Sequence, residues 1–99
     1  MIVGKVSIVC GKELFNELIS ELSIGAIDTI RKWPNGDFII LYTDGVIDLN
    51  VGHDTDVIEV VVYTSDFRNL SVFIDHIINV IEKNGVKTED CVDINIHDT

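Results

Sequence analysis

The sequence predicts an α+β fold, in which a single, mainly antiparallel sheet of about six strands carries two helices on one face. Three observations predict it. Ile and Val make up 29 of the 99 residues, a strong bias toward strands. Two segments repeat their apolar residues with the helical period, and the other apolar segments alternate or run continuously, as strands do. A hydrophobic content of 46% excludes disorder, so we expect residues 1–99 to form one α+β domain.

The first third of the chain predicts a strand, a helix and a second strand. Residues 2–10 are apolar on both faces, which is typical of a strand in the interior of a sheet. Residues 12–23 place apolar side chains on one face and three glutamates on the other, the pattern of an amphipathic helix. Residues 26–33 end at the turn sequence Pro34-Asn35-Gly36, so we expect them to form a hairpin with residues 37–43.

Two further strands follow in the middle of the chain. Asp44-Gly45 is a second tight-turn dipeptide, and residues 46–51 alternate apolar and polar side chains after it. Residues 57–63 are again apolar on both faces, interrupted only by Glu59. Together with the first hairpin, these residues predict a meander of antiparallel strands.

The C-terminal third predicts a long helix and a last strand. Thr64-Ser65-Asp66 supplies cap residues for a helix that continues to Lys83, with Val72 and Val80 widening its apolar stripe. Residues 92–97 then alternate, with a polar and partly acidic outer face that suits an edge strand.

The predicted element order is therefore β-α-β-β-β-β-α-β. It is close to a ferredoxin-like split βαβ unit with an added hairpin, and both helices should lie on the same face. This architecture hosts many unrelated functions, so the function has to be inferred from the residues themselves.

The charge of the chain is high and unevenly distributed along the sequence. Seventeen acids and seven bases give a net charge of −10. Residues 1–36 sum to zero, and residues 37–66 hold seven acids without a base. Direct binding to nucleic acid and to anionic membranes is disfavoured, because both depend on Lys and Arg. A basic surface on a protein partner is the complementary target.

Cysteine usage and the lack of a signal peptide or a membrane-spanning apolar stretch predict a cytoplasmic protein. Cys10 and Cys91 are the two cysteines, and we expect reduced, buried thiols that are neighbours if the first and last strands pair. Cys10, at the start of the first helix, is the best candidate for a reactive residue, although a buried spacer is the simpler role.

The densest polar segment lies between Asp44 and Asp56. His53, Asp54 and Asp56 could offer an imidazole and two carboxylates to a divalent ion, but the spacing matches no known metal loop, so a solvated turn is the simpler interpretation. His76 and His97 lie too far apart in the sequence to suggest a shared site. We therefore predict no cofactor, no metal and no enzymatic activity.

The leading hypothesis is a small acidic inhibitor that masks the basic, nucleic-acid-binding surface of a protein partner, with carboxylates standing in for phosphates. Immunity proteins against nuclease toxins and phage anti-defence proteins, including anti-CRISPR proteins, share this size and charge. The partner would then be a nuclease or a CRISPR effector. The predicted partner-binding residues are five acids and one aromatic anchor: Asp37, Asp44, Asp48, Asp54, Asp56 and Trp33.

Two alternatives belong to other functional classes. One is a homo-oligomeric, ferredoxin-like ligand-binding or regulatory module, in the simplest case a homodimer, with small ligands bound between paired sheets. The other is a metal-dependent enzyme that uses His53, Asp54 and Asp56.

Overall fold

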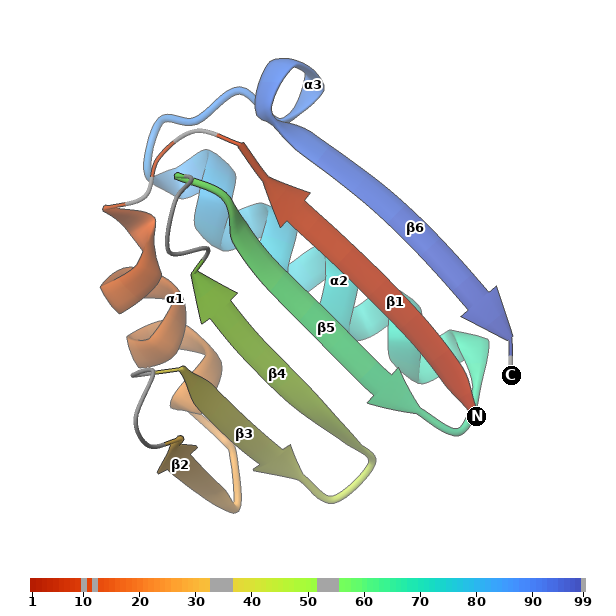
Figure 1. Cartoon of the computed structure of the whole chain (residues 1–99). Helices are drawn as coiled ribbons and strands as arrows, with labels where there is room; N and C mark the ends of the chain where they lie inside the picture. The colour runs from red at the N-terminus through yellow and green to blue at the C-terminus, as the bar shows by residue number, and fades with distance from the viewer. Residues whose placement is uncertain (10, 12, 33–36, 52–55, 99) are drawn as a thin grey trace.

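The computed structural model describes residues 1–9, 11, 13–32, 37–51 and 56–98. It confirms the predicted α+β fold, with an open six-stranded sheet in the order β2-β3-β4-β5-β1-β6 and with α1 and α2 on the same face (Figure 1). The described strands are β1 Ile2–Ile8, β2 Asp28–Arg31, β3 Phe38–Tyr42, β4 Gly45–Val51, β5 Ile58–Thr64 and β6 Val92–Asp98. The described helices are α1 Leu14–Ser23, α2 Phe67–Lys83 and α3 Thr88–Cys91.

The strand pairing follows the predicted meander and the two predicted strand–helix–strand passages. All five neighbouring pairs are antiparallel. β1, α1, β4, β5, α2 and β6 follow the β-α-β-β-α-β order of a ferredoxin-like unit, and β2 and β3 add a hairpin at one edge. The turn predicted at Pro34-Asn35-Gly36 lies outside the described residues, although β2 and β3 pair on either side of it.

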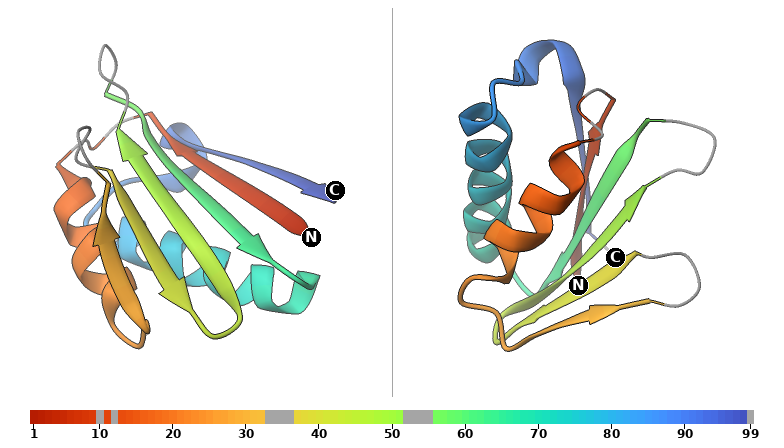
Figure 2. Two further views of the ribbon diagram at one scale, coloured as in Figure 1. Left: turned by 60° about the horizontal axis from the view of Figure 1, so that its bottom comes forward. Right: turned by 90° about the vertical axis from the view of Figure 1, so that its left-hand side faces the viewer.

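The hydrophobic core lies between the sheet and the two long helices (Figure 2). β1 and β5, the strands that are apolar on both faces, are interior strands as predicted, and their burial alternates along the chain. The helices contribute the apolar stripes that the period predicts. Their fully or nearly fully buried residues are Leu14, Leu18 and Leu22 from α1 and Leu70, Ile77, Val80 and Ile81 from α2.

The long helix α2 begins where the cap residues predict. Asp66 is its N-cap, and the Asp66 carboxylate accepts a hydrogen bond of 2.8 Å from the backbone N–H of Asn69. Val80 is buried, but Val72 is 65% exposed, so Val72 does not belong to the buried stripe. It lies two residues after buried Leu70, a rotation of about 200° around the helix axis, and therefore faces away from the sheet.

Aromatic side chains join α1, β3 and α2. The Tyr42 and Phe73 rings lie 5.0 Å apart, and the Tyr42 hydroxyl donates a hydrogen bond to the backbone carbonyl of Leu22 at the end of α1. Burial raises the pKa of Tyr42 to about 12, so its hydroxyl remains a donor over the physiological range. Gly45 makes this packing possible, because a Cβ there would lie 2.8 Å from the Phe73 ring and 2.9 Å from the backbone oxygen of Tyr63.

The sequence did not predict α3, a single turn that leads into β6. Cys91 ends this turn and is disulfide-bonded, which corrects the expectation of a reduced thiol. The backbone N–H of Val9 donates to the carbonyl of Cys91 at 2.8 Å, so the end of β1 lies beside it. Cys10, the other cysteine in the sequence, lies outside the described residues. Within the described ranges, none of the helices has the length and apolar character needed to cross a bilayer.

Candidate protein-binding face

The face of the sheet opposite α1 and α2 is covered by none of the described elements (Figures 1 and 2). We call it the open face. Side chains alternate along each strand, so the neighbours of the buried core residues point toward this face. Pairing brings Leu41, Val46, Tyr63 and Val3 next to one another across four strands. These four half-buried residues form the apolar row of the open face.

A second band crosses the open face beside the apolar row. Here Ile39 of β3 pairs with Asp48 of β4, and Asp48 pairs with Val61 of β5. A single carboxylate therefore lies between two aliphatic side chains in the middle of the sheet. Ile30 continues the band onto β2 and is 44% exposed. The open face is consequently apolar at its centre rather than uniformly acidic.

An ion pair neutralises Asp48 within the protein. Lys32, which follows β2, places its Nζ 2.9 Å from Asp48 Oδ2, although β3 lies between their strands. The hydrogen bond to Asp48 raises the pKa of Lys32, so the lysine stays charged. The other carboxylate oxygen, Asp48 Oδ1, is buried without a hydrogen-bond partner. Asp48 therefore has an internal partner, and its charge is not freely displayed to another molecule.

A second ion pair on the open face is more exposed. Lys5 Nζ lies 3.3 Å from Glu59 Oε1, and both side chains are about 40% exposed. Such a pair contributes little to stability, because water and salt screen it. Lys5 and Lys32, the lysines that the described residues place on the open face, thus both contact carboxylates, one at the surface and one half-buried.

The other predicted acids lie at the two ends of the strands. Asp37 precedes β3 and Asp56 precedes β5, so both lie at one end of the sheet. Asp44 lies in the turn between β3 and β4 at the opposite end, about 20 Å away at the usual rise of a strand. Asp44 and Asp56 are exposed, and Asp37 is half-buried. The predicted acids therefore surround the apolar centre instead of forming one cluster, while Asp54 and Trp33 lie outside the described residues.

A shallow hollow lies beside the apolar row, at the end of the sheet where Asp44 is found. Val46 and Tyr63 line a depression of about 340 Å³ together with Asp44 and Ser65. The Thr64 hydroxyl donates to the carbonyl of Asp44 at 2.9 Å, which fixes the turn at the edge of this hollow. An aromatic ring beside a shallow apolar depression is a feature that protein interfaces share.

Metal ligands do not gather among the described residues: no three His, Cys, Asp or Glu side chains there are close enough to share an ion. His53 and Asp54, two of the three ligands considered above, lie outside those residues, so the expectation about metal binding remains a prediction. Among the described members of the polar segment, Asp44 and Asp56 lie at opposite ends of the sheet.

The fold and this face together define the protein as an α+β domain of ferredoxin-like topology with one uncovered sheet surface. Comparisons with protein-family models, with curated proteins and with solved structures give no match to the chain. Its function must therefore be inferred from the open face itself.

Proposed function

We propose that this protein is a small acidic, non-enzymatic inhibitor that binds a protein partner through its open face and masks a basic, nucleic-acid-binding surface there. One observation carries the proposal. The uncovered face has an apolar row at its centre and the acids Asp37, Asp44 and Asp56 around it, the anatomy of an interface with an apolar core and a charged rim. The net charge of −10 favours a basic partner.

The apolar row and the acids would have different tasks in such a complex. Val46 and Tyr63 would be desolvated by the partner and supply most of the affinity. The acids at the strand ends would accelerate association with Lys- and Arg-rich surfaces, which is the usual effect of charges at a rim. The proposed partners are a nuclease toxin or a CRISPR effector, as for immunity and phage anti-defence proteins.

The test is a competition experiment. Fluorescently labelled nucleic acid is bound to each member of a panel of nuclease toxins and CRISPR effectors, and its displacement by this protein is followed by anisotropy. We expect displacement from one class, with an association rate that falls steeply as salt rises, because exposed charges are screened within about 8 Å at physiological ionic strength. The panel can be extended by proteins captured from the native host.

Matched charge reversals locate the surface. Asp37→Lys with Asp44→Lys changes the open-face rim, while Glu13→Lys with Glu17→Lys makes the same change in net charge on exposed positions of α1 and next to it. We expect the first pair to slow association by about tenfold or more and the second pair to have a much smaller effect. Asp48 is unsuitable for this test, because its reversal would also break the pair with Lys32.

Two outcomes would contradict the proposal. Equal effects of the two pairs of reversals would mean that only diffuse charge acts, without a defined face. Association that is independent of salt would mean that the acids serve solubility alone. In that case the second candidate, a homo-oligomeric ligand-binding or regulatory module, would lead, since the hollow beside Tyr63 offers space for a small ligand.

A further inference from the structure

The edge strand β6 is long, and two aspartates, Asp93 and Asp98, are its charged protection against pairing. It has seven residues and one described neighbour, β1 (Figure 1). The opposite edge strand, β2, has only four residues. Edge strands are normally protected by charged side chains, above all lysine, by proline, by a bulge or by shortness, and residues 92–98 contain two aspartates but neither lysine nor proline. β6 therefore offers an extended row of backbone groups to another strand.

The register shows which backbone groups face the free edge. Val9 and Cys91 follow Ile8 and Val92, the last pair of the ladder, and the Val9 N–H donates to the Cys91 carbonyl at 2.8 Å. In an antiparallel ladder, hydrogen-bonded pairs alternate with non-hydrogen-bonded pairs. Asp93, Asn95 and His97 therefore direct their backbone groups toward β1. The backbone groups of Val92, Ile94, Ile96 and Asp98 point outward.

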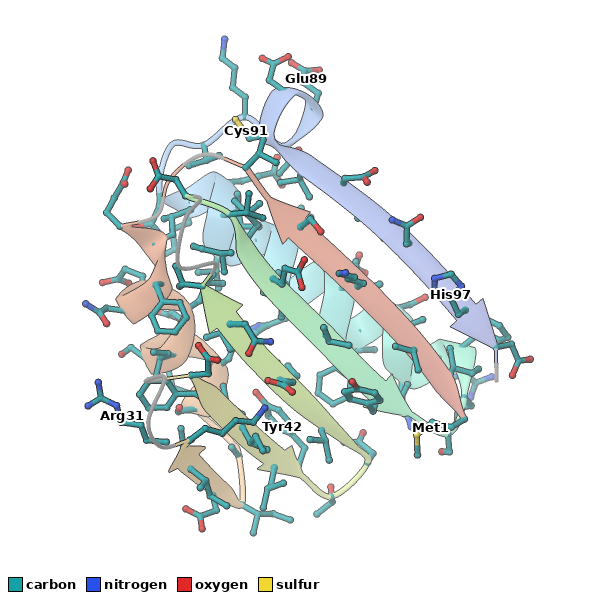
Figure 3. All side chains as sticks on the ribbon, in the orientation of Figure 1. Met1, Arg31, Tyr42, Glu89, Cys91 and His97 are labelled. Carbon is teal, nitrogen blue, oxygen red and sulfur yellow. The ribbon has the colours of Figure 1, made fainter. Side chains whose placement is uncertain are left out.

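The side chains of β6 are exposed in two different rows. Ile94 and Ile96 point to the helix side of the sheet, yet they are 41% and 50% exposed, because α2 packs over β1 and β5. Leu70 and Ile74 of α2 occupy the space over Gly4 of β1, the partner of Ile96. The helix therefore covers β1 and leaves the side chains of β6 exposed. Asp93, Asn95 and His97 point to the open face, where Figure 3 shows His97 on β6.

The central part of the strand, residues 93–97, is self-complementary about Asn95. If two copies of β6 pair in antiparallel fashion with Asn95 opposite Asn95, then Ile94 lies opposite Ile96 and Asp93 lies opposite His97, each pair occurring twice. The residues with outward backbone groups meet one another in this register, so the hydrogen-bond ladder continues. Asp93 and His97 then form a non-hydrogen-bonded pair, in which side chains approach most closely.

Neighbouring registers lose this match. A shift by two residues in one direction places Asp93 opposite Asn95. The opposite shift places Ile94 opposite Asp98. A shift by one residue would align outward backbone groups with inward ones and place side chains on the wrong face. Of these registers, only the one centred on Asn95 pairs Ile94 with Ile96 and also pairs Asp93 with His97.

We propose that β6 binds β6 of a second copy of this chain, antiparallel about a two-fold axis at Asn95, and so joins two sheets into one. The occupant of this edge is a second copy because Ile94 with Ile96, and Asp93 with His97, find their complements on the same strand, with only the outer pair Val92–Asp98 unmatched. The proposal does not depend on the function proposed for the open face, which both copies would keep exposed. Two copies of charge −10 repel each other, so dimerisation should strengthen as salt rises, opposite to binding of a basic partner.

The test is sedimentation velocity of the full chain over a range of concentrations, with variants that exchange the charges of the cross-strand pair. Asp93→Lys places the new lysine opposite His97, and His97→Glu places the new glutamate opposite Asp93. We expect each single variant to raise the dimer dissociation constant by about tenfold, because each removes the Asp93–His97 pair and the two-fold axis doubles that loss. The double variant places lysine opposite glutamate and should restore dimerisation to within about threefold of the original.

Asn95→Cys provides an independent geometric readout. The two Cα atoms at the axis would be about 4.5 Å apart, which a disulfide can bridge, so oxidation should trap a covalent dimer. Ser7→Cys is the control, because Ser7 lies on the neighbouring strand β1, away from the free edge. A monomer at every concentration up to about 1 mM would overturn the proposal. A dimer whose dissociation constant is unchanged by the substitutions at Asp93 and His97 would also overturn it. So would a covalent dimer that forms through a cysteine at position 7 and not through one at position 95.

Discussion

At the scale of single residues, Asp48 shows how a strand can hold a carboxylate among aliphatic neighbours. Ile39 and Val61 lie on either side of it, and Lys32 supplies the opposite charge at 2.9 Å. The buried oxygen Oδ1 makes this pair sensitive, since a buried polar atom without a partner costs free energy. Lys5 and Glu59 form a pair of similar length at the surface, where water can replace either partner.

This contrast gives a prediction for two matched variants. Lys32→Met should lower the free energy of unfolding by about 1–3 kcal/mol, because it leaves the Asp48 carboxylate without its cation. Lys5→Met should cost less than about 1 kcal/mol, because Glu59 is accessible to water. Urea denaturation measures both. The double variant Lys32→Met with Asp48→Val should recover most of the loss, and a double variant as unstable as Lys32→Met would disprove the explanation.

At the scale of elements, the helices are positioned by a few contacts at their ends. Asp66 begins α2, and Tyr42 binds the end of α1 through the carbonyl of Leu22. At the other end of α2, Lys83 contacts Glu21 of α1 at 3.2 Å, so the two helices are also linked at the surface. The apolar stripes of both helices hold them on one face of the sheet, these contacts fix the ends of the helices there, and none of the described elements covers the opposite face.

Loss of the N-cap of α2 should destabilise the helix. Asp66→Ala should lower the free energy of unfolding by about 1 kcal/mol, since the Asn69 N–H loses its acceptor at the start of the helix. Asp75→Ala, which removes an exposed carboxylate from the middle of the same helix, should change stability by less than about 0.5 kcal/mol. Thermal or urea denaturation compares them. A larger loss for Asp75→Ala would show that the cap does not stabilise α2.

At the scale of the whole molecule, the acidic character of the sequence is spread through space. Residues 37–99 carry the whole net charge, and their strands are not grouped together in the sheet. β3, β4 and β5 lie between β2 and β1, the two strands of residues 1–36, and β6 lies beyond β1. Exposed acids also occupy the helix side, Glu17 on α1 and Glu82 on α2 among them. The principal extents are 31, 30 and 24 Å, so charges on opposite surfaces are separated by about 30 Å or less.

Self-repulsion of these charges leads to the prediction for the whole molecule. Raising ionic strength from about 0.01 M to about 0.15 M shortens the screening length from about 30 Å to about 8 Å. The midpoint of thermal unfolding should therefore rise with ionic strength. It is measured at a protein concentration at which sedimentation shows only monomer. Glu13→Gln with Glu17→Gln should make the rise smaller, because it reduces the repulsion. A midpoint that falls with salt would mean that the surface ion pairs outweigh the repulsion.

The sequence by itself determined the elements and the class of fold. Apolar period, turn dipeptides and the cap at Asp66 act over a few residues, and such local preferences can be recognised without knowing the partners of each strand. They predicted two long helices, the hairpins and an interior position for the strands that became β1 and β5. The single turn α3 was missed because four residues carry no periodic pattern.

Only the tertiary structure decided which side chains meet. Strand order and register bring Leu41, Val46, Tyr63 and Val3 into one row and place Lys32 against Asp48, although the last two are 16 residues apart in the sequence. The acids between Asp37 and Asp56 read as one cluster along the chain, but β4 separates the ends of the sheet at which they lie. Residues that are close in sequence lie far apart when a strand separates them, and residues that are distant in sequence come into contact when their strands pair. Composition alone could therefore suggest the hypothesis of an acidic binding protein, but not the face that it would use.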